Sequence, residues 1–222
     1  MHLRRRVLMS DTFNRADNVD LGANWDAGYT GDTNLQIVTN RVRGTSTTLD
    51  ATETWNGPVM AGDQWAEMTI PTFAGAGTKA PRLMLCMKPP PTKSGYEFAA
   101  LTVDTGTTTR VTRWTAGAYE AQGHSLITWV SGDVIRAEIR ASALYIYRNN
   151  GSNPVLVVEK GSFGAGTGAV YNEGRAGVLI YSVVIADTEI DTWSAGDFVQ
   201  DRMEFANFPK HKHREAILRG EI

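Results

Sequence analysis

Apolar and polar side chains alternate with a period of two along several segments, and this pattern restricts the fold more than any other feature. In Asp133–Arg140, Ile135, Ala137 and Ile139 share one face, and charged side chains occupy the other face. Gln64–Ile70 alternates in the same way. Because successive side chains of a β-strand point to opposite faces, each segment predicts an antiparallel strand with one buried face.

Two further segments, Arg82–Met87 and Gly177–Ile185, are apolar on both faces and predict strands that are covered on both sides. Such strands cannot lie in a sheet with one wet face, so two layers must pack together. Helical periodicity is nearly absent before residue 200, and a length of 222 residues suits one large β domain. The sequence therefore predicts an all-β fold, a two-layer antiparallel β-sandwich.

Turn residues separate the predicted strands and indicate two hairpins. Asn149-Asn150-Gly151 tolerates positive φ, so Leu144–Arg148 is expected to turn into Val155–Glu159. Tyr96–Asp104 and Thr108–Trp114 flank a short Thr-Gly-Thr stretch and predict a second hairpin. Strand and turn signals alternate in this way along most of the chain, which is typical of a sandwich.

The bulk composition excludes several classes of protein. A net charge of −2 provides no general field for attracting nucleic acid or anionic lipid. No run of about 18 apolar residues is present, so no membrane-spanning helix is expected. The single cysteine, Cys86, excludes an internal disulfide and favours folding in a reducing compartment.

Both ends of the chain differ in character from the middle. Residues 1–10 are basic, but the apolar run Val7–Met9 is too short for an export signal, so we expect a basic N-terminal arm or a first strand. Residues 201–222 carry five Lys or Arg, four Asp or Glu and two His, with apolar residues only in isolation. This composition predicts an extended charged C-terminal arm over residues 199–222, and a disordered tail is the alternative.

Motifs near both ends of the predicted domain resemble a known family. Asp11-Thr12-Phe13-Asn14-Arg15, followed by Leu21-Gly22 and Trp25, resembles the opening of concanavalin A-like and laminin-G-like modules from bacterial surface proteins and phage virions. Gly174–Tyr181, with Asp191-Thr192-Trp193 and Gly196-Asp197, resembles their closing segment. The resemblance implies a jelly roll over residues 11–198 whose first and last strands are neighbours. Phe13 and Trp25 are then expected to close the core rather than to contact a ligand.

The sequence offers no convincing catalytic or metal site. Glu189-Ile190-Asp191 begins the E-x-D-x-x-E pattern of related glucanases, but Ser194 stands where the second Glu is required, so we predict no enzyme. Cys86 lies in an apolar strand, which favours an inert thiol. No cofactor or metal is predicted, because the cations that flank His211 and His213 oppose a metal site there. Calcium, common in lectin-like relatives, would have only the scattered turn aspartates Asp17, Asp20, Asp26 and Asp32.

Phosphate-binding and serine-triad motifs are likewise incomplete or absent. Gly161–Gly168 is glycine-rich but lacks the Lys-Ser/Thr of a phosphate loop, so we expect a surface loop. No G-x-S-x-G motif is present, which leaves a serine triad without support.

Aromatic residues provide the candidate ligand contacts, because sugars stack their apolar faces on aromatic rings. In the predicted register Trp65, Tyr145 and Tyr147 point outward, and Trp114 and Tyr119 lie where a strand ends and a loop begins. These five residues are the carbohydrate-binding candidates. Surface aromatics without a ligand are also common in folded proteins.

Two functional hypotheses follow, from different classes. The leading one is a non-enzymatic structural or adhesion component of a phage virion, made in the host cytoplasm, whose partners are other virion proteins, copies of itself and host glycans. Its assembly arms would comprise Arg4, Arg5, Arg6, Phe205, Phe208, Lys210, Lys212 and Arg214. The alternative is a free carbohydrate-binding lectin-like module, and a glycoside hydrolase is a distant third. Neither nucleic-acid binding nor membrane insertion is expected.

Overall fold

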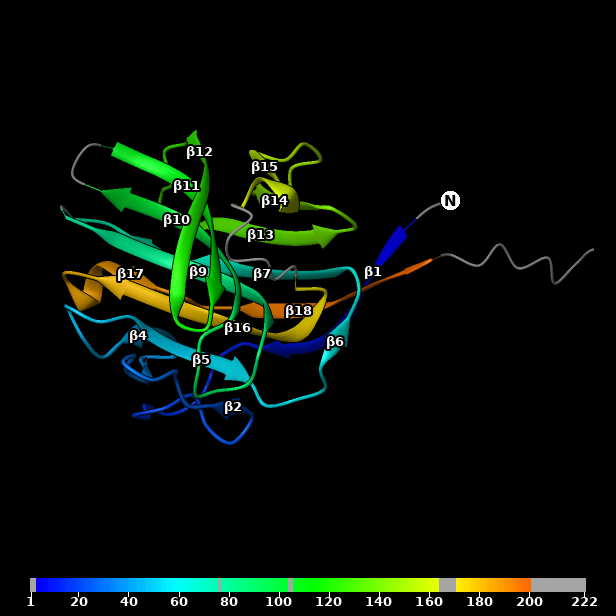
Figure 1. Cartoon of the computed structure of the whole chain (residues 1–222). Coiled ribbons are helices and arrows are strands. Elements are labelled where there is room, and N and C mark those ends of the chain that lie inside the picture. Colours follow the sequence, from blue (N-terminus) through cyan, green and yellow to red (C-terminus); the bar gives the residue numbers. More distant parts are fainter. Residues whose placement is uncertain (1–2, 76, 104–105, 164–170, 201–222) are drawn as a thin grey trace, which may run out of the picture.

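Two antiparallel β-sheets form the framework of the protein in a computed structural model, which describes residues 3–75, 77–103, 106–163 and 171–200 (Figure 1). The first sheet has six strands, in the spatial order β1 (Leu3–Asp11), β18 (Trp193–Gln200), β7 (Gln64–Ile70), β13 (Asp133–Arg140), β14 (Ala143–Arg148) and β15 (Leu156–Glu159). The predicted two-layer antiparallel sandwich is confirmed.

The second sheet has eight strands. In spatial order they are β12 (Ala118–Leu126), β11 (Gly106–Thr115), β10 (Gly95–Val103), β9 (Lys79–Met87), β16 (Glu173–Ser182), β5 (Ala51–Trp55) and β2 (Trp25–Asp26), with β6 (Met60–Ala61) also paired to β16. Two short ribbons complete the fold, namely β3 (Leu35–Val38) with β4 (Arg41–Gly44) and β8 (Thr72–Phe73) with β17 (Thr188–Glu189).

Helix is confined to single turns in the described part of the chain. The two 3₁₀ turns are η1 (Lys160–Ser162) and η3 (Ile185–Asp187). Within these same residues no helix is long and apolar enough to cross a membrane.

The predicted hairpins form with the expected turn chemistry. β13 pairs with β14, and β14 pairs with β15 across a turn in which Asn149 and Asn150 have φ angles of 50° and 56°. β10 pairs with β11 along its whole length, as the second hairpin required. The strand predicted over 177–185 corresponds to β16, which ends earlier than expected, at Ser182. Ile185 lies in η3.

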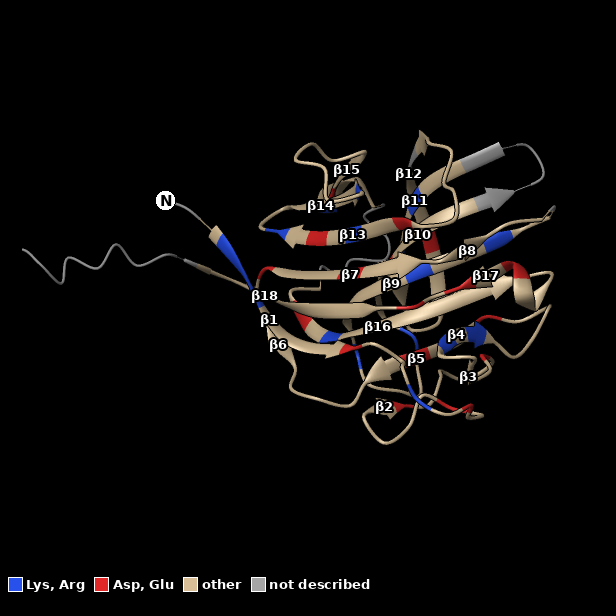
Figure 2. Ribbon diagram, turned by 180° about the vertical axis from the view of Figure 1, so that it is seen from behind, with Lys and Arg blue, Asp and Glu red and all other residues tan. Residues whose placement is uncertain are grey.

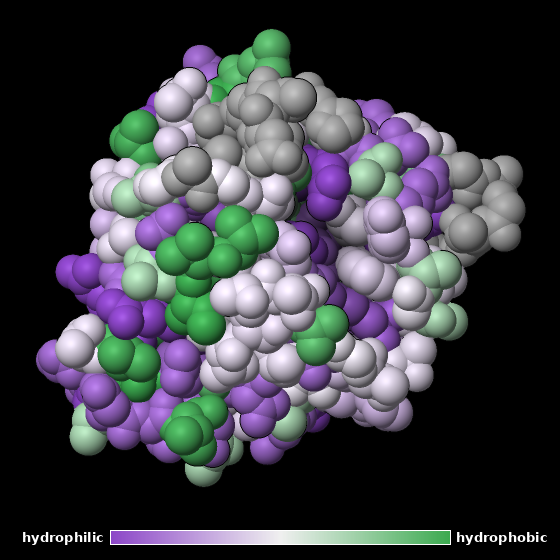
Figure 3. Space-filling view, turned by 90° about the vertical axis from the view of Figure 1, so that its left-hand side faces the viewer, coloured by the Kyte–Doolittle hydropathy of each residue, from purple (hydrophilic) through white to green (hydrophobic). Residues whose placement is uncertain are grey.

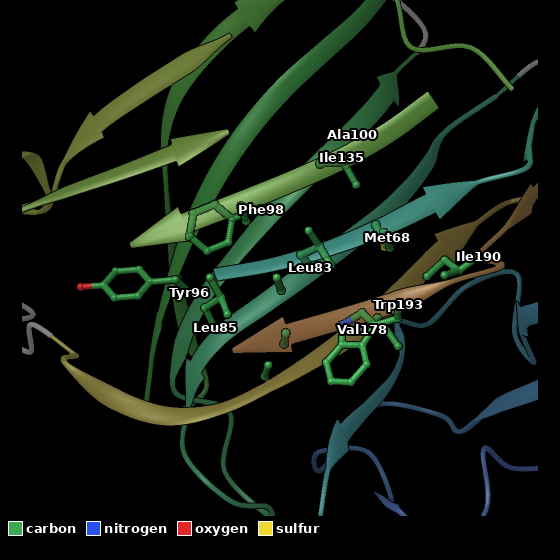
Figure 4. Close-up of a cluster of buried hydrophobic side chains, with 14 of the residues drawn as sticks. Met68, Leu83, Leu85, Tyr96, Phe98, Ala100, Ile135, Val178, Ile190 and Trp193 are labelled. Carbon is green, nitrogen blue, oxygen red and sulfur yellow. The ribbon is translucent and has the colours of Figure 1, made fainter. Parts of the chain in front are cut away.

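The core lies between the two sheets, where the apolar faces of their strands meet (Figure 4). β9 shows why its sequence is apolar on both sides: Leu83 and Leu85 point into this core, and Met84 belongs to a smaller buried cluster on the outer face of the eight-stranded sheet. Tyr96 and Phe98 of the neighbouring β10 extend the main core. The sheets therefore share one continuous apolar layer.

The first and last strands close the sandwich together. β1 pairs with β18 from Leu3 opposite Gln200 to Asp11 opposite Trp193. Trp193 is buried against Trp25, with ring centroids 4.8 Å apart, and against Trp55 at 5.6 Å. The two ends of the domain thus contribute to one aromatic cluster at the edge of the core.

The opening motif has a structural explanation centred on the carboxylate of Asp11. This carboxylate accepts hydrogen bonds from the Phe13 amide at 2.8 Å, from the Arg15 guanidinium at 2.7 Å and from Trp25 Nε1 at 2.9 Å. Arg15 also donates to the carbonyl oxygen of Leu21 at 2.6 Å. Phe13 and Trp25 are buried beside each other, so these residues close the core as expected.

Candidate functional site

A tight hairpin between β11 and β12 places two aromatic rings side by side. Ala116 and Gly117 both have positive φ, at 50° and 86°, which is the geometry of a two-residue hairpin turn. Trp114 and Tyr119 are therefore direct cross-strand partners, and their ring centroids lie 5.4 Å apart. Tyr119 is 67% exposed and Trp114 is half-buried. Tyr119, which was expected where a strand ends and a loop begins, lies instead near the start of the next strand, β12.

The loop that connects β9 to β10 brings Lys93 over this hairpin. The Lys93 carbonyl accepts a hydrogen bond from the Gly117 amide at 2.9 Å, and the Ser94 hydroxyl accepts one from the Ala116 amide at 2.9 Å. The Lys93 ammonium lies 4.4 Å from the centre of the Trp114 ring. The β9–β10 loop and the hairpin thus fix one face of the indole.

Beneath Trp114, the outer face of the eight-stranded sheet carries a buried network of charges. Glu97 of β10 is fully buried; its carboxylate accepts a hydrogen bond from Arg82 of β9 at 2.9 Å and forms an ion pair with Lys93 at 2.9 Å. Lys93 also lies 3.3 Å from Asp32 and 3.3 Å from Asp50. Three carboxylates therefore surround two cations.

The network sets the protonation of its members. Burial raises the pKa of Glu97, but the charges of Lys93 and Arg82 outweigh burial and hold that pKa at about 2. Burial lowers the pKa of Lys93, and Glu97, Asp50 and Asp32 together raise it above its ordinary value. Both groups are therefore charged at neutral pH. We call this network of charged side chains beneath the aromatic pair the ionic floor.

Two adjoining cavities open above this floor and share the Trp114 ring. One has a volume of about 430 Å³, and the other, of about 200 Å³, lies between Tyr119 and Arg110. We refer to the two together as the outer groove, which is formed by Asp32, Asp50, Arg82, Lys93, Glu97, Arg110, Trp114 and Tyr119. A view onto one end of the sandwich shows a hollow in which strongly hydrophilic residues gather (Figure 3).

The other three predicted aromatic contacts lie on the opposite sheet. Trp65, Tyr145 and Tyr147 are on the outer face of the six-stranded sheet, as their alternation predicts, but Trp65 is only 3% exposed and Tyr147 only 5%. Arginine side chains cover them: Arg5 lies 5.2 Å from the Trp65 ring and Arg136 lies 4.1 Å from the Tyr147 ring. The structure therefore gathers two of the five candidates in the outer groove and separates the other three from them.

Glu189, which begins the pattern that resembled a catalytic one, is engaged in structural ion pairs. Glu189 is buried, and its carboxylate accepts hydrogen bonds from Arg41 at 2.7 Å, Arg43 at 2.6 Å and Thr72 at 2.5 Å. These contacts join β17 to the β3–β4 ribbon and hold the pKa of Glu189 below its ordinary value despite the opposing effect of burial. Glu189 thus links the ribbons of the fold.

The four turn aspartates lie apart in separate interactions. Asp17 accepts a hydrogen bond from the Thr39 amide at 2.7 Å, Asp20 accepts one from the Gly22 amide at 2.8 Å, and Asp26 pairs with Arg175. Asp32 belongs to the outer groove. Among the residues that the structure describes, no group of three or more His, Cys, Asp or Glu side chains could hold a metal ion.

Cys86 is buried near the end of β9, in the middle of the eight-stranded sheet. Burial raises the pKa of the Cys86 thiol to about 12. Arg4, Arg5 and Arg6 lie in β1, whose ribbon is basic near the N-terminus (Figure 2). Arg6 pairs with Asp197 at 2.5 Å and Arg5 with Glu67 at 3.5 Å. The remaining predicted residues, Phe205, Phe208, Lys210, His211, Lys212, His213 and Arg214, lie outside the described residues, as does most of the loop Gly161–Gly168.

The charged half of the outer groove was not identified from the sequence. Arg82 and Glu97 lie inside segments that otherwise read as apolar strands, and Lys93, Asp50 and Asp32 come from loops far apart in the sequence. A charged residue inside a two-sided strand was the available signal, because such a side chain is buried only with a partner.

Comparisons with solved structures identify the architecture. The chain superposes on a carbohydrate-binding module, CBM66, from Bacillus subtilis with a TM-score of 0.53 and 17% identity, covering 79% of this chain and 93% of that one. The chain therefore has a lectin-like jelly-roll fold. A Bacillus subtilis protein of unknown function with a galectin-like fold gives a TM-score of 0.62 at 9% identity, covering 90% and 100%.

The VIP36 exoplasmic/lumenal domain in its Ca²⁺/Man₃GlcNAc-bound form gives a TM-score of 0.59 at 9% identity, covering 83% of this chain and 88% of that one. No family model and no curated protein sequence matches the chain. The concanavalin A-like architecture predicted from the terminal motifs is confirmed as a fold.

Proposed function

We propose that this protein is a carbohydrate-binding module whose binding site is the outer groove. The observation that carries the proposal is the Trp114–Tyr119 pair, fixed by a tight hairpin beside two cavities and above a floor of charged side chains. A sugar ring offers an apolar face for an aromatic ring and hydroxyl groups for charged hydrogen-bonding groups, and the groove provides both kinds of partner. Solved structures with this fold include a carbohydrate-binding module and a mannose-bound lumenal domain.

A glycan array compared across three proteins tests the site. We expect Trp114→Ala to weaken binding of the glycans recognised by the unaltered protein by about 30-fold or more, because a central aromatic contact typically contributes about 2 kcal/mol. Tyr145→Ala is the matched control, since Tyr145 is a half-buried aromatic on the outer face of the other sheet. Equal loss in both variants, or an array without any bound glycan, would contradict the proposal.

Binding without turnover is part of the same proposal. The buried carboxylates of the groove are held by Arg82 and Lys93, and Glu189 is held by Arg41 and Arg43. A reducing-sugar assay on the bound glycans is expected to show no release of product. Steady turnover that survives purification would overturn this part.

As the setting in which this module acts, we propose a phage virion surface, with other virion proteins and copies of this chain as partners. The motifs at the two ends of the domain and the charges of residues 201–222 support it. Deleting residues 201–222 leaves β18 complete and is expected to abolish incorporation into particles while glycan binding persists. Unchanged incorporation would exclude the arm from assembly.

A further inference from the structure

One cation of the outer groove differs from the other two in its lack of a partner. Arg110 of β11 lines the cavity of about 200 Å³ together with Trp114 and Tyr119. In the described part of the chain its guanidinium makes no ion pair, and its Nε atom is buried without a hydrogen-bond acceptor. Arg82 and Lys93, in contrast, are each bound to Glu97 and to Asp50.

The sheet register explains why Arg110 stays unpaired. Arg110 lies opposite Ala99 of β10, and Ala99 lies opposite Arg82 of β9 on its other side. The small side chain of Ala99 therefore separates two arginines that point to the same face of the sheet. Burial, and after it the positive charge of Arg82, lower the pKa of Arg110. An arginine remains charged under these conditions, so the cavity contains a partly desolvated guanidinium that has no ion-pair partner among the described residues.

The carboxylates near the cavity do not provide a partner for Arg110. Asp50 also lines the cavity, but its Oδ2 atom lies 3.4 Å from Arg82 and 3.3 Å from Lys93, so its charge is already compensated. Glu97 is fully buried beneath the same two cations. The chemical group that Arg110 lacks is an anionic acceptor that enters from the open side of the cavity.

We infer that the glycan bound in the outer groove carries a carboxylate, and that Arg110 binds this carboxylate. A planar guanidinium and a planar carboxylate form paired hydrogen bonds, which a neutral hydroxyl group cannot reproduce. The ring of the same sugar unit would then contact Trp114 or Tyr119, which line the same cavity. This inference rests on the proposed function, and it assigns acidic sugars such as uronic or sialic acids as the ligand class.

The test compares acidic glycans with their own neutral forms. An array would carry uronic-acid and sialic-acid glycans, the same glycans after reduction of the carboxyl group to an alcohol, and sulfated neutral glycans. We expect the carboxylate forms to bind at least about tenfold more tightly than the reduced forms, and Arg110→Gln to remove this preference while its thermal midpoint stays close to that of the unaltered protein. Arg5→Gln, on β1 of the other sheet, is the control and should keep the preference.

The possible results separate this inference from the proposed function. Binding of neutral and carboxylate forms with equal affinity, or equal loss of both in Arg110→Gln, would overturn the carboxylate inference and leave carbohydrate binding standing. Preference for the sulfated glycans over the carboxylates would overturn the carboxylate inference as well, because the site would then bind sulfate more tightly than carboxylate. An array without any ligand would overturn both proposals.

Discussion

Replacing Glu97 with alanine is expected to destabilise the protein by about 3–5 kcal/mol, because it leaves two buried cations with weaker partners. Glu97 is the one carboxylate of the network that contacts both Arg82 and Lys93 at 2.9 Å, and its side chain is fully buried. Glu97→Gln keeps the shape but loses the charge, so it is expected to be destabilising as well. Urea unfolding at neutral pH measures both effects.

The pH dependence of the Glu97 effect has a definite sign. The pKa of Glu97 is about 2 in the folded protein and 4.5 as the ordinary value for glutamate. A carboxyl group with a depressed folded pKa contributes stability above its unfolded pKa and loses it as the pH falls through its folded pKa. The stability difference between the unaltered protein and Glu97→Gln should therefore shrink as the pH falls from about 4.5 to about 2.

A surface pair provides the control for Glu97. Glu67 pairs with Arg5 at 3.5 Å on the outer face of the six-stranded sheet, where both side chains remain partly exposed. Glu67→Ala is expected to cost less than about 1 kcal/mol, since exposed ion pairs contribute little. Equal effects of Glu67→Ala and Glu97→Ala would show that the buried network does not stabilise the fold.

Replacing Trp193 with alanine is expected to cost about 3–5 kcal/mol, because it opens a large cavity where the two ends of the domain meet. Trp193 is 2% exposed and packs against Trp25 and Trp55. Its Nε1 atom has no hydrogen-bond acceptor among the described residues, so its contribution is mainly packing. The loss should appear as a lower urea midpoint without a change in glycan binding by the folded fraction.

Phenylalanine at the same position separates packing from other causes. Trp193→Phe retains most of the ring contacts with Trp25 and Trp55, and we expect it to cost about 1–2 kcal/mol. A loss as large as that of the alanine variant would indicate that the indole nitrogen, rather than the ring volume, holds the closing strand in place.

The long strands could be predicted because their side chains repeat a simple pattern. β7 begins and ends where the alternation of Gln64–Ile70 does, and the two-sided sequence of Arg82–Met87 corresponds to β9, which lies between β10 and β16. Short strands such as β2, β6 and β8 contain two residues each, which is too few for any periodicity. Their existence depends on neighbours that only the folded sheets provide.

The candidate site could be predicted in part from residue type, and the rest required the fold. Trp114 and Tyr119 were candidates because they are aromatic and were expected where a strand ends and a loop begins, and the hairpin brings them together. Trp65 and Tyr147 share that residue type and point outward, yet Arg5 and Arg136 cover them. Which outward aromatic is accessible depends on long side chains from neighbouring strands, and their positions follow from sheet order rather than from local sequence.

The position of the bound glycan on the two sheets tests the central claim most directly. Backbone amide shifts followed by NMR during titration with the strongest array ligand would locate it. We predict shifts in the segment 110–119 and around Lys93, and unchanged amides in the segment 136–147 of the opposite sheet. Shifts confined to the outer face of the six-stranded sheet, around Tyr145 and Tyr147, would contradict the assignment of the outer groove as the binding site.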